Sequence, residues 1–536
     1  MIMPIQKQLD VLFVSADSSI QAYQELAKSY SAIEPPTWSL LLAQSCRSKG
    51  YDTAILDSTA ECLSMAQSVE RIHEANPRLV CFVVYGQNPN SGTTNMIGNT
   101  ALADMLREQY PEHLICFVGS HSSALPLEVL RDHESIDLVL YNEGVYALHN
   151  LLASSLSPED LKKVKGIGHK LEGQPTLNPP EQVVPQDRMD EDLPGYAWDL
   201  LPYDKKPLDL YRSHFWHTEY DHAKRTPFAA VYSSLGCRFK CDFCMINIVN
   251  RNDDSDEVVS AHSPNMRYWS PEFMLQEFDK LAGMGVETIR ISDEMFFLDR
   301  RFFEPLLTGL VERDYPIRTW SYARVDTVRA KYLDLFQKAG MRWLGIGIEA
   351  ADQVIRKEVS KGTFKEINIR EVVQSIQDSG INVGANFIFG FPDDTRESME
   401  ETLALALELN TEFANMYPCQ ALPGSPLHLR ARQEGWKLPD NYAGYAFLSY
   451  ESQPLPTKHL SAAEVLQFRD DAWQTYFTNP AYLSLLESKF GTEQRCNVEE
   501  MAKIKLKRKL LEASVSSPRQ RFGLQHDIKS RKGITA

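Results

Sequence analysis

The sequence predicts an α/β fold in three parts: a doubly wound parallel sheet, a partial (β/α)6 barrel and a carboxyl-terminal helical domain. Short apolar runs alternate with amphipathic helical stretches between residues 11 and 141, and a second, longer alternation extends from 228 to 419. Strands that alternate with helices form parallel sheets, which bind ligands at the carboxyl ends of their strands. Beyond residue 430 the strand signals stop and helical patterns remain.

The first alternation predicts a Rossmann-like domain over residues 1–164. We expect strands at Val11–Ser15, Thr53–Asp57, Leu79–Tyr85, Leu114–Gly119 and Asp137–Tyr141, and helices at Pro36–Lys49, Met65–Ala75, Asn99–Tyr110 and Leu125–Asp132. Small and amide residues follow three of these strands, at Gly86–Thr94, Gly119–His121 and Asn142–Gly144. Small residues let a backbone approach a large planar ligand closely, so this edge of the sheet is a candidate binding edge.

Residues 165–225 are rich in proline, which indicates an ordered linker. The second alternation predicts a TIM-type barrel over 226–430, with strands at Phe228–Ser234, Thr288–Asp293, Arg318–Arg324, Arg342–Glu349, Asn382–Gly390 and Phe413–Cys419. The helices between them are expected at Pro271–Met284, Arg301–Val311, Val328–Ala339, Glu366–Ser379 and Arg396–Leu409. Such barrels carry their active site at the carboxyl ends of the strands, where Asp293, Glu294, Arg324 and Glu349 fall.

The carboxyl-terminal domain is expected over 431–513. Its helices are predicted at Ser461–Asn479, Tyr482–Phe490 and Val498–Ala513. Residues 514–536 form a basic segment with little apolar periodicity, which is typical of a solvated tail.

Size and charge exclude several classes of protein. The 536 residues are 43% hydrophobic and 24% charged, which is ordinary for a globular protein and unlike a collagen, a coiled coil or a disordered chain. The net charge of −16 argues against broad nucleic-acid binding, because that function needs a basic face. The start lacks a secretory signal pattern and no apolar run approaches the ~18 residues of a membrane helix, so we expect a cytoplasmic protein.

Three of the nine cysteines are clustered on the loop after the first barrel strand, as Cys237-x-x-x-Cys241-x-x-Cys244. Thiolates at this spacing can surround one compact centre of soft metal ions. Structural zinc needs four ligands, and a zinc site completed by Cys419 stays open as an alternative. On a four-iron cluster, three cysteines would leave one iron free to bind a substrate.

This motif resembles that of the radical S-adenosylmethionine (SAM) superfamily. The resemblance implies a 4Fe–4S cluster whose open iron chelates SAM, and one-electron cleavage of SAM to a 5′-deoxyadenosyl radical. Segments matching the family follow in order, at Ile291–Phe296, Gly345–Ala350 and Asn386–Pro392. They imply that the residues contacting SAM are Asp293, Glu294, Arg324, Glu349, Asn386 and Gly390. Ser292-Asp293-Glu294 stands where many members have Gly-Gly-Glu, so either carboxylate is a candidate for the amino group of SAM.

The amino-terminal domain is similar to that of cobalamin-binding radical SAM enzymes of the methyltransferase class. The proline pair ending at Pro36 and the segments Phe117–Pro126 and Leu138–Gly144 carry this resemblance. It implies that cobalamin contacts Pro36, Gly86, Ser91, Gly119, Ser120, His121, Glu143 and Gly144. The chain has no Asp-x-His-x-x-Gly motif for the lower cobalt ligand, so His121 is expected to make a backbone contact. A vestigial fold without cobalamin is the alternative.

The resemblance implies methylation of an unactivated carbon, by way of a 5′-deoxyadenosyl radical and methylcobalamin. We expect a small-molecule substrate of natural-product, sugar or nucleotide type, and an external electron donor of flavodoxin or ferredoxin type. Three alternatives stay open: a non-methylating rearrangement, cyclisation or dehydrogenation, in which Cys419 could donate hydrogen; RNA modification; and a non-enzymatic cofactor sensor.

Overall fold

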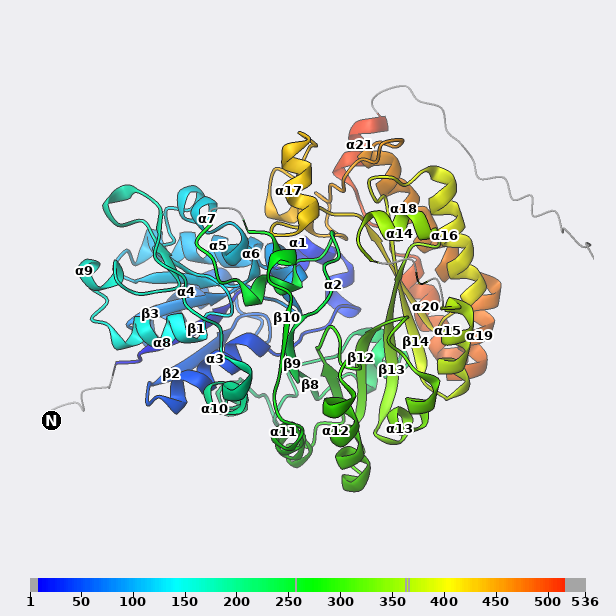
Figure 1. Ribbon diagram of the computed structural model, residues 1–536, viewed down its shortest axis with the longest axis horizontal. Helices are drawn as coiled ribbons and strands as arrows, with labels where there is room; N and C mark the ends of the chain where they lie inside the picture. The colour runs from blue at the N-terminus through cyan, green and yellow to red at the C-terminus, as the bar shows by residue number, and fades with distance from the viewer. Residues whose placement is uncertain (1–7, 256–257, 362–363, 365–366, 516–536) are drawn as a thin grey trace, which may run out of the picture.

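The protein is described by a computed structural model over residues 8–255, 258–361, 364 and 367–515. Two α/β bodies lie side by side, and the helices that follow the second one cover its outer side (Figure 1). Of the tail predicted at 514–536, all but the first two residues lie outside the described part of the chain. None of the described helices combines the length and the apolar character needed to cross a bilayer.

The amino-terminal body is a seven-stranded sheet in the order β2-β1-β3-β4-β5-β6-β7. Its five predicted strands are confirmed as β1 (Val11–Ser15), β2 (Thr53–Asp57), β3 (Leu79–Val83), β4 (Ile115–Val118) and β5 (Leu138–Leu140), and neighbouring strands among them run parallel. Its main helices are α3 (Thr37–Ser48), α4 (Met65–Ala75), α5 (Gly92–Gln109), α7 (Pro126–Asp132) and α8 (Val145–Ala153). Helix α5 begins seven residues earlier than the predicted Asn99, which places its amino end beside the loop after β3.

Short elements that the sequence did not predict complete this body. Strands β6 (Ile167–His169) and β7 (Thr176–Leu177) add antiparallel to β5, so the sheet continues past residue 164. Helices α1 (Ser19–Tyr23), α2 (Leu26–Ser29) and α6 (Ser120–Ala124) follow the carboxyl ends of strands or lie between the two bodies (Figure 1). Elements of two to five residues carry too little periodicity to be recognised from sequence.

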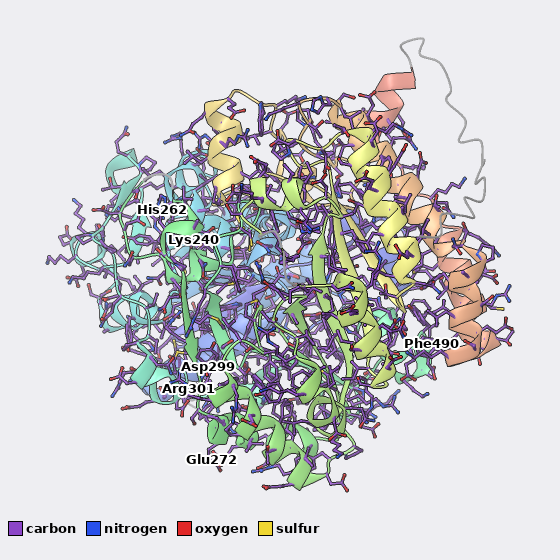
Figure 2. The ribbon with its side chains drawn as sticks, turned by 45° about the vertical axis from the view of Figure 1, so that its right-hand side comes forward. Lys240, His262, Glu272, Asp299, Arg301 and Phe490 are labelled. Carbon is purple, nitrogen blue, oxygen red and sulfur yellow. The ribbon has the colours of Figure 1, made fainter. Side chains whose placement is uncertain are left out.

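The second body is a six-stranded parallel sheet in the order β15-β14-β13-β12-β11-β8, which is the predicted partial barrel. Its strands are β8 (Phe228–Val231), β11 (Thr288–Ile291), β12 (Arg318–Arg324), β13 (Met341–Glu349), β14 (Asn382–Phe389) and β15 (Phe413–Pro418). Its helices are α11 (Pro271–Gly283), α12 (Arg300–Arg313), α13 (Leu333–Lys338), α14 (Gln353–Glu358), α15 (Ile369–Asp378) and α16 (Arg396–Leu409). In Figure 2, Glu272, Asp299 and Arg301 mark the amino ends of α11 and α12, where Arg301 pairs with Asp299 at 2.9 Å.

The first barrel strand is shorter than predicted. It ends at Val231, and a hairpin of β9 (Ser234–Cys237) and β10 (Asn265–Tyr268) follows it. The first cluster cysteine therefore ends β9 instead of standing directly after a barrel strand. The linker packs inside the barrel, where Trp216 contacts Trp320, Trp343 and Phe413 with ring centres 5.0–5.1 Å apart.

The carboxyl-terminal part contains α17 (Pro426–Gln433), α18 (Ala462–Phe477), α19 (Pro480–Phe490), α20 (Thr492–Ala502) and α21 (Lys509–Val515). The helix predicted at Val498–Ala513 is wrong as a single element, because residues 503–508 leave the helical path between α20 and α21. Arg508 is buried there, with its guanidinium on Asp470 of α18. Phe490 ends α19 on the outer side of the barrel (Figure 2).

Candidate functional site

A cavity of about 460 Å³ lies between the two bodies, at the carboxyl ends of the barrel strands. Six regions contribute to its lining: the α1–α2 segment, the loop after β3, the linker, the cysteine loop, the barrel strands with the loops at their ends, and the carboxyl-terminal part of the chain. Among the polar and cysteine side chains that line it are Gln87, Asn88, Asn90, Ser91, Thr94, His214, Cys237, Cys241, Cys244, Glu294, Arg324, Glu349, Lys361, Asn386, Asn415, Cys419, Gln420 and Arg469. The two domains therefore share one binding space.

The three cluster cysteines all reach this cavity, and each is half-buried. Asn247 Oδ1 accepts a hydrogen bond from the backbone N–H of Cys237 at 2.8 Å, which fixes the start of the loop. Burial raises the pKa of the Cys237 thiol to about 11 and also raises the pKa of the other two thiols. The thiols are thus protonated at neutral pH, and a bound metal would have to deprotonate them.

The spread of the three sulfurs favours a cluster over a single ion. Among the described residues, His73, Glu112 and His113 are the only three ligand groups whose atoms all lie within 4.8 Å of one another. The cysteine sulfurs therefore stand further apart than the ligands of one zinc ion would, since zinc–sulfur bonds measure about 2.3 Å. This donor set fits a multi-iron cluster held by three thiolates and does not fit the zinc alternative.

The neighbouring carboxylates Asp293 and Glu294 have different surroundings. Asp293 is fully buried, and its oxygens accept hydrogen bonds from the backbone N–H and hydroxyl of Ser233 and from the hydroxyl of Ser234, at 2.6–2.7 Å. Glu294 lines the cavity, and its buried Oε1 has no partner among the described residues. Burial raises the pKa of Glu294 to about 7, against the opposing effect of Arg290. Asp293 thus fixes the start of the β9–β10 hairpin, while Glu294 offers an unpartnered oxygen to a cationic group.

Two cations stand beside the cysteines. Arg324 at the end of β12 lies over the ring of Phe239 at 3.8 Å, and its Nη1 donates to Cys241 Sγ at 3.7 Å. Lys361 is buried and pairs with Glu349 Oε1 at 2.7 Å. A Cβ on Gly347 would come within 2.9 Å of Lys361 Nζ and 2.7 Å of Glu349 Oε1, so a larger residue there would displace this ion pair. No local sequence pattern indicates a role for Lys361, which lies in the loop after α14.

Two further predicted SAM residues differ in their placement. Asn386 lines the cavity and accepts a hydrogen bond from Asn415 Nδ2 at 2.9 Å. Gly390 does not line the cavity; it has a φ of 88°, and a Cβ there would come within 2.3 Å of Val465 on α18. Its glycine is explained by the close approach of α18. Cys419 lines the cavity but is buried, and burial raises the pKa of its thiol well above the ordinary value.

In the amino-terminal domain, the loop after β3 provides the contacts with the cavity. Ser91 lines it, together with the amide side chains of Gln87, Asn88 and Asn90 from the predicted binding edge. Asn90 reaches across to the cysteine loop, where its Oδ1 accepts from the backbone N–H of Met245 at 3.0 Å and its Nδ2 donates to Cys244 Sγ at 3.8 Å. Gly86 has a φ of 67° at the start of this loop, which an L side chain rarely adopts.

The other residues predicted to contact cobalamin lie behind this loop and do not line the cavity. Ser120 donates to the carbonyl of Pro89 at 2.6 Å, and His121 Nδ1 lies 3.0 Å from the Thr93 hydroxyl. A Cβ on Gly119 would overlap the Val84 backbone. Burial lowers the pKa of His121 to about 3, so the ring is neutral. These residues support the loop from within the domain.

Three more of these positions have structural roles in the described protein. Glu143 is buried and pairs with Arg267 at 2.7 Å. Gly144 caps the amino end of α8 with a φ of 82°, and Pro36 caps that of α3. The edge that faces the cavity therefore consists of small and amide residues from the loop after β3. This polar edge fits the amide-rich rim of a corrin. None of the side chains that the loop after β3 presents to the cavity is a typical cobalt ligand.

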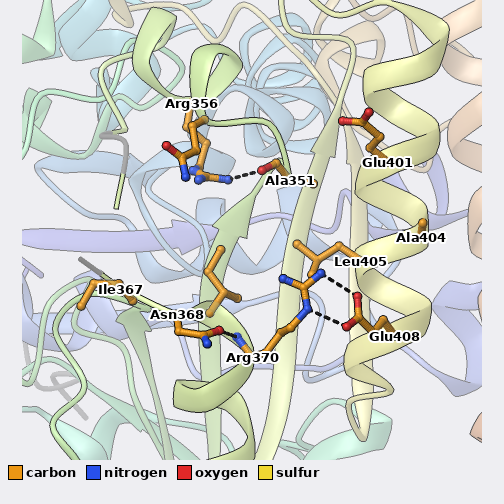
Figure 3. A pocket seen from close by; sticks show the side chains of 11 residues that line it. Ala351, Arg356, Ile367, Asn368, Arg370, Glu401, Ala404, Leu405 and Glu408 are labelled. Carbon is orange, nitrogen blue, oxygen red and sulfur yellow. Dashed lines mark hydrogen bonds and ion pairs between the residues drawn. The ribbon is translucent and has the colours of Figure 1, made fainter. Parts of the chain in front are cut away.

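A second hollow of about 390 Å³ lies on the outside of the barrel and is separate from the site. Figure 3 shows Arg370 of α15 paired there with Glu408 of α16, at 2.6 Å between Nε and Oε1. It also shows Arg356 donating to the carbonyl of Ala351 at 2.8 Å. No cysteine or strand end of the cavity described above contributes to its lining.

Comparisons with known proteins match both bodies to families. Residues 231–406 match the Radical SAM superfamily and residues 26–152 match the B12 binding domain. A protein of Pyrococcus horikoshii named as an uncharacterized methyltransferase is 24% identical over 450 residues, which cover 84% of this chain and 89% of the relative. The anaerobic magnesium-protoporphyrin IX monomethyl ester cyclase of Rubrivivax gelatinosus is 26% identical, and the match covers 71% of this chain and 63% of the cyclase.

Solved structures share the whole architecture. The radical SAM methyltransferase TsrM of Kitasatospora setae, with cobalamin and a 4Fe–4S cluster bound, superposes with a TM-score of 0.63 at 16% identity, covering 92% of this chain and 100% of TsrM. The cobalamin-dependent SAM radical enzyme OxsB, with aqua-cobalamin and SAM bound, gives 0.64 at 16% identity, covering 92% of this chain and 72% of OxsB. At this identity the likeness concerns the fold.

The two family matches, the shared cavity and the three-cysteine loop agree with one another. They imply three cofactors for this chain, a 4Fe–4S cluster, SAM and cobalamin. The chain therefore carries a B12 binding domain and a radical SAM domain, which is the combination of a cobalamin-dependent radical SAM enzyme.

Proposed function

We propose that this enzyme transfers a methyl group from SAM to a carbon atom of a small molecule. One observation carries the proposal: the three cluster cysteines, the unpartnered carboxylate oxygen of Glu294 and the loop after β3 all face the same cavity. Methyl transfer that uses both cofactors requires them to reach one substrate, and a cavity shared by the two domains meets that requirement.

When bound, the cluster supplies the electron that cleaves SAM, and cobalamin carries the methyl group. The chain's own residues hold these groups in place. Cys237, Cys241 and Cys244 provide the thiolates for the cluster, and Arg324 donates a hydrogen bond to one of the sulfurs. Glu294 binds the amino group of SAM, because it offers the unpartnered oxygen and Asp293 does not.

The walls of the cavity supply apolar surface around these groups. Phe243, Met295, Ile388 and Leu422 supply apolar surface near the strand ends, and carboxyl-terminal residues cover the far side. A mostly apolar lining strengthens each polar contact inside the cavity. This lining supports chemistry on an unactivated carbon of a molecule small enough to fit inside.

The electron comes from an external donor of flavodoxin or ferredoxin type. The cysteine loop presents Arg238 and Lys240 to solvent on a chain whose net charge is −16, and His262 lies on the same side (Figure 2). Local basic side chains next to the cluster suit an acidic donor. An oxygen-sensitive cluster also requires a reducing compartment, which supports the cytoplasm as the location.

The relatives support methyl transfer and also favour one second candidate. The relative that is covered over 89% of its length carries a methyltransferase name, and so does a cobalamin-dependent enzyme of Streptomyces tokunonensis, TokK, at 21% identity. Two of the other relatives are anaerobic cyclases that form a ring on a porphyrin ester, with 63% and 65% of their length covered. Oxidative ring formation is therefore the second candidate.

Counting the products of SAM separates the two candidates. The reconstituted enzyme is incubated without oxygen with methyl-labelled SAM, a chemical reductant and a small-molecule extract of the source cells. Methyl transfer predicts S-adenosylhomocysteine and 5′-deoxyadenosine in equal amounts, and label in a new small molecule. Formation of 5′-deoxyadenosine without S-adenosylhomocysteine would contradict methyl transfer and favour ring formation.

A further inference from the structure

The carboxyl-terminal helix α18 presents a charged side chain to the cavity. Arg469 lines the cavity and is 5% exposed, and Trp473 lies one helical turn further along the same helix and also lines it. No family match covers this helix, since the radical SAM match ends at residue 406. This wall is the part of the cavity that the cofactor-binding segments do not provide.

Two hydrogen bonds fix the position of the Arg469 side chain. Its Nε donates to the carbonyl of Met416 on β15 at 2.6 Å, and its Nη1 donates to Asp470 Oδ1 at 2.8 Å. The structure gives Nη2 no partner among the described residues. The guanidinium therefore keeps free N–H groups for a ligand in the cavity, with its position fixed by β15.

The charge around Arg469 is unbalanced. Asp470 also accepts two hydrogen bonds from Arg508, at 2.9 Å from Nε and 2.8 Å from Nη2. Two buried arginines thus share one carboxylate, which leaves one net positive charge in the wall. Burial of an uncompensated charge is unfavourable, so the site favours a ligand that brings a single negative charge.

The other cations of the cavity have their own carboxylates. Arg324 pairs with Asp326 at 3.0 Å, and Lys361 pairs with Glu349 at 2.7 Å. Among the described lining residues, Arg469 is the cation whose carboxylate partner is shared with a second arginine. The excess charge is therefore a property of this wall, and the cysteine side of the cavity does not have it.

We propose that Arg469 binds a carboxylate of the substrate, and that the apolar or aromatic body of the substrate lies along Trp473. This inference rests on the proposed function, because it assigns a substrate class to the same cavity. A carboxylate matches both the planar N–H groups of a guanidinium and its single excess charge, whereas a phosphate dianion would reverse the charge. Trp473 and Met501 supply the apolar surface beside it.

The test uses 2-naphthoate and its uncharged amide, 2-naphthamide, as probes of equal shape. Binding to the full-length protein is measured by calorimetry for the wild type, R469Q, R469K and R495Q. We expect the wild type to bind naphthoate about tenfold more tightly than the amide, because one charge-assisted hydrogen bond typically changes the affinity by about this factor. R469Q should lose this preference and R469K should keep part of it. Arg495, an exposed arginine paired with Glu487, serves as the matched control, and R495Q should bind like the wild type.

Equal binding of the two probes to the wild type, or failure of naphthoate to bind it, would overturn the proposal. A preference that survives in R469Q would do the same. Because R469Q should still bind the uncharged amide as the wild type does, a loss of naphthoate binding alone in this variant is not due to misfolding. The readout does not depend on turnover, so absence of S-adenosylhomocysteine in the product count would refute methyl transfer and leave the carboxylate preference standing.

Discussion

Glu34 and Arg290 form a buried ion pair between the two domains. Arg290 Nη1 on β11 contacts both oxygens of Glu34 at 2.7 and 2.8 Å, and the two side chains are 1% and 5% exposed. Arg290 also lies over the rings of Trp320 and Tyr322 inside the barrel. The contact therefore joins the segment before α3 to the barrel interior beneath the cavity.

Breaking this pair from one side should destabilise the protein strongly. E34Q leaves Arg290 buried without a counter-charge, which typically costs about 3–5 kcal/mol. We expect a marked fall in the thermal midpoint of E34Q, and partial recovery in the double variant E34Q/R290M, in which neither charge remains. Differential scanning calorimetry of the three proteins gives the comparison, and a midpoint unchanged in E34Q would show that the pair contributes nothing.

The carboxylates Asp293 and Glu294 should give opposite phenotypes. E294Q removes the charge that faces the cavity, so SAM binding and 5′-deoxyadenosine formation should fall by at least tenfold while the fold and the iron content stay normal. D293N removes an acceptor used by Ser233 and Ser234, so it should lower the thermal midpoint instead. SAM affinity and melting, measured on both variants, test this division; the reverse pattern would assign the SAM contact to Asp293.

This division between neighbours marks the limit of what the sequence could predict. Some strands were predicted to the residue, as at Val11–Ser15, because a short continuous apolar run is typical of a parallel strand that is buried on both faces. The cysteine motif identified the cluster ligands because their spacing is local. The roles of Asp293 and Glu294 depend on which carboxylate meets Ser233, a contact across 60 residues that no local pattern records.

Two other site residues could not be predicted from the sequence for the same reason. Lys361 and Arg469 become important only through partners that the fold brings to them, Glu349 in one case and Asp470 with Arg508 in the other. His121 shows the converse. Its position after β4 matched a cobalamin-binding family, and the fold places its ring behind the loop after β3, on Thr93.

SAM binding should depend on pH through Glu294. Burial raises the pKa of this carboxyl to about 7 in the folded protein, so below pH 7 it is protonated and cannot attract an ammonium group. SAM affinity should fall by up to tenfold per pH unit below 7 and should level off above it. In the ligand-free protein the sign is opposite: the contribution of Glu294 to stability is full below its ordinary pKa of 4.5 and is lost as the pH rises through about 7.

Titration of SAM into the reconstituted enzyme between pH 6 and 8 measures this dependence. E294Q is the control, since its weak binding should not vary over the same range. Equal pH profiles for the wild type and E294Q would assign the dependence to another group.

Alanine substitutions of the cluster cysteines and of Cys419 should have different effects on iron binding. Alanine at Cys237, Cys241 or Cys244 should abolish iron binding, because three thiolates are the minimum that the motif provides. C419A should keep its iron and still cleave SAM, since Cys419 is buried among Phe391 and Leu455. Iron analysis and 5′-deoxyadenosine formation test this; loss of iron in C419A would make Cys419 a fourth ligand.

The central claim is that one cavity brings the cluster and cobalamin together, across the contact of Asn90 with Cys244 and Met245. The most direct test is electron paramagnetic resonance of the enzyme with reduced cluster and cob(II)alamin. We predict that each signal is broadened by magnetic coupling to the other, and that the cob(II)alamin signal sharpens in C241A, which lacks the cluster. Two signals that add as independent centres in the wild type would contradict the shared cavity.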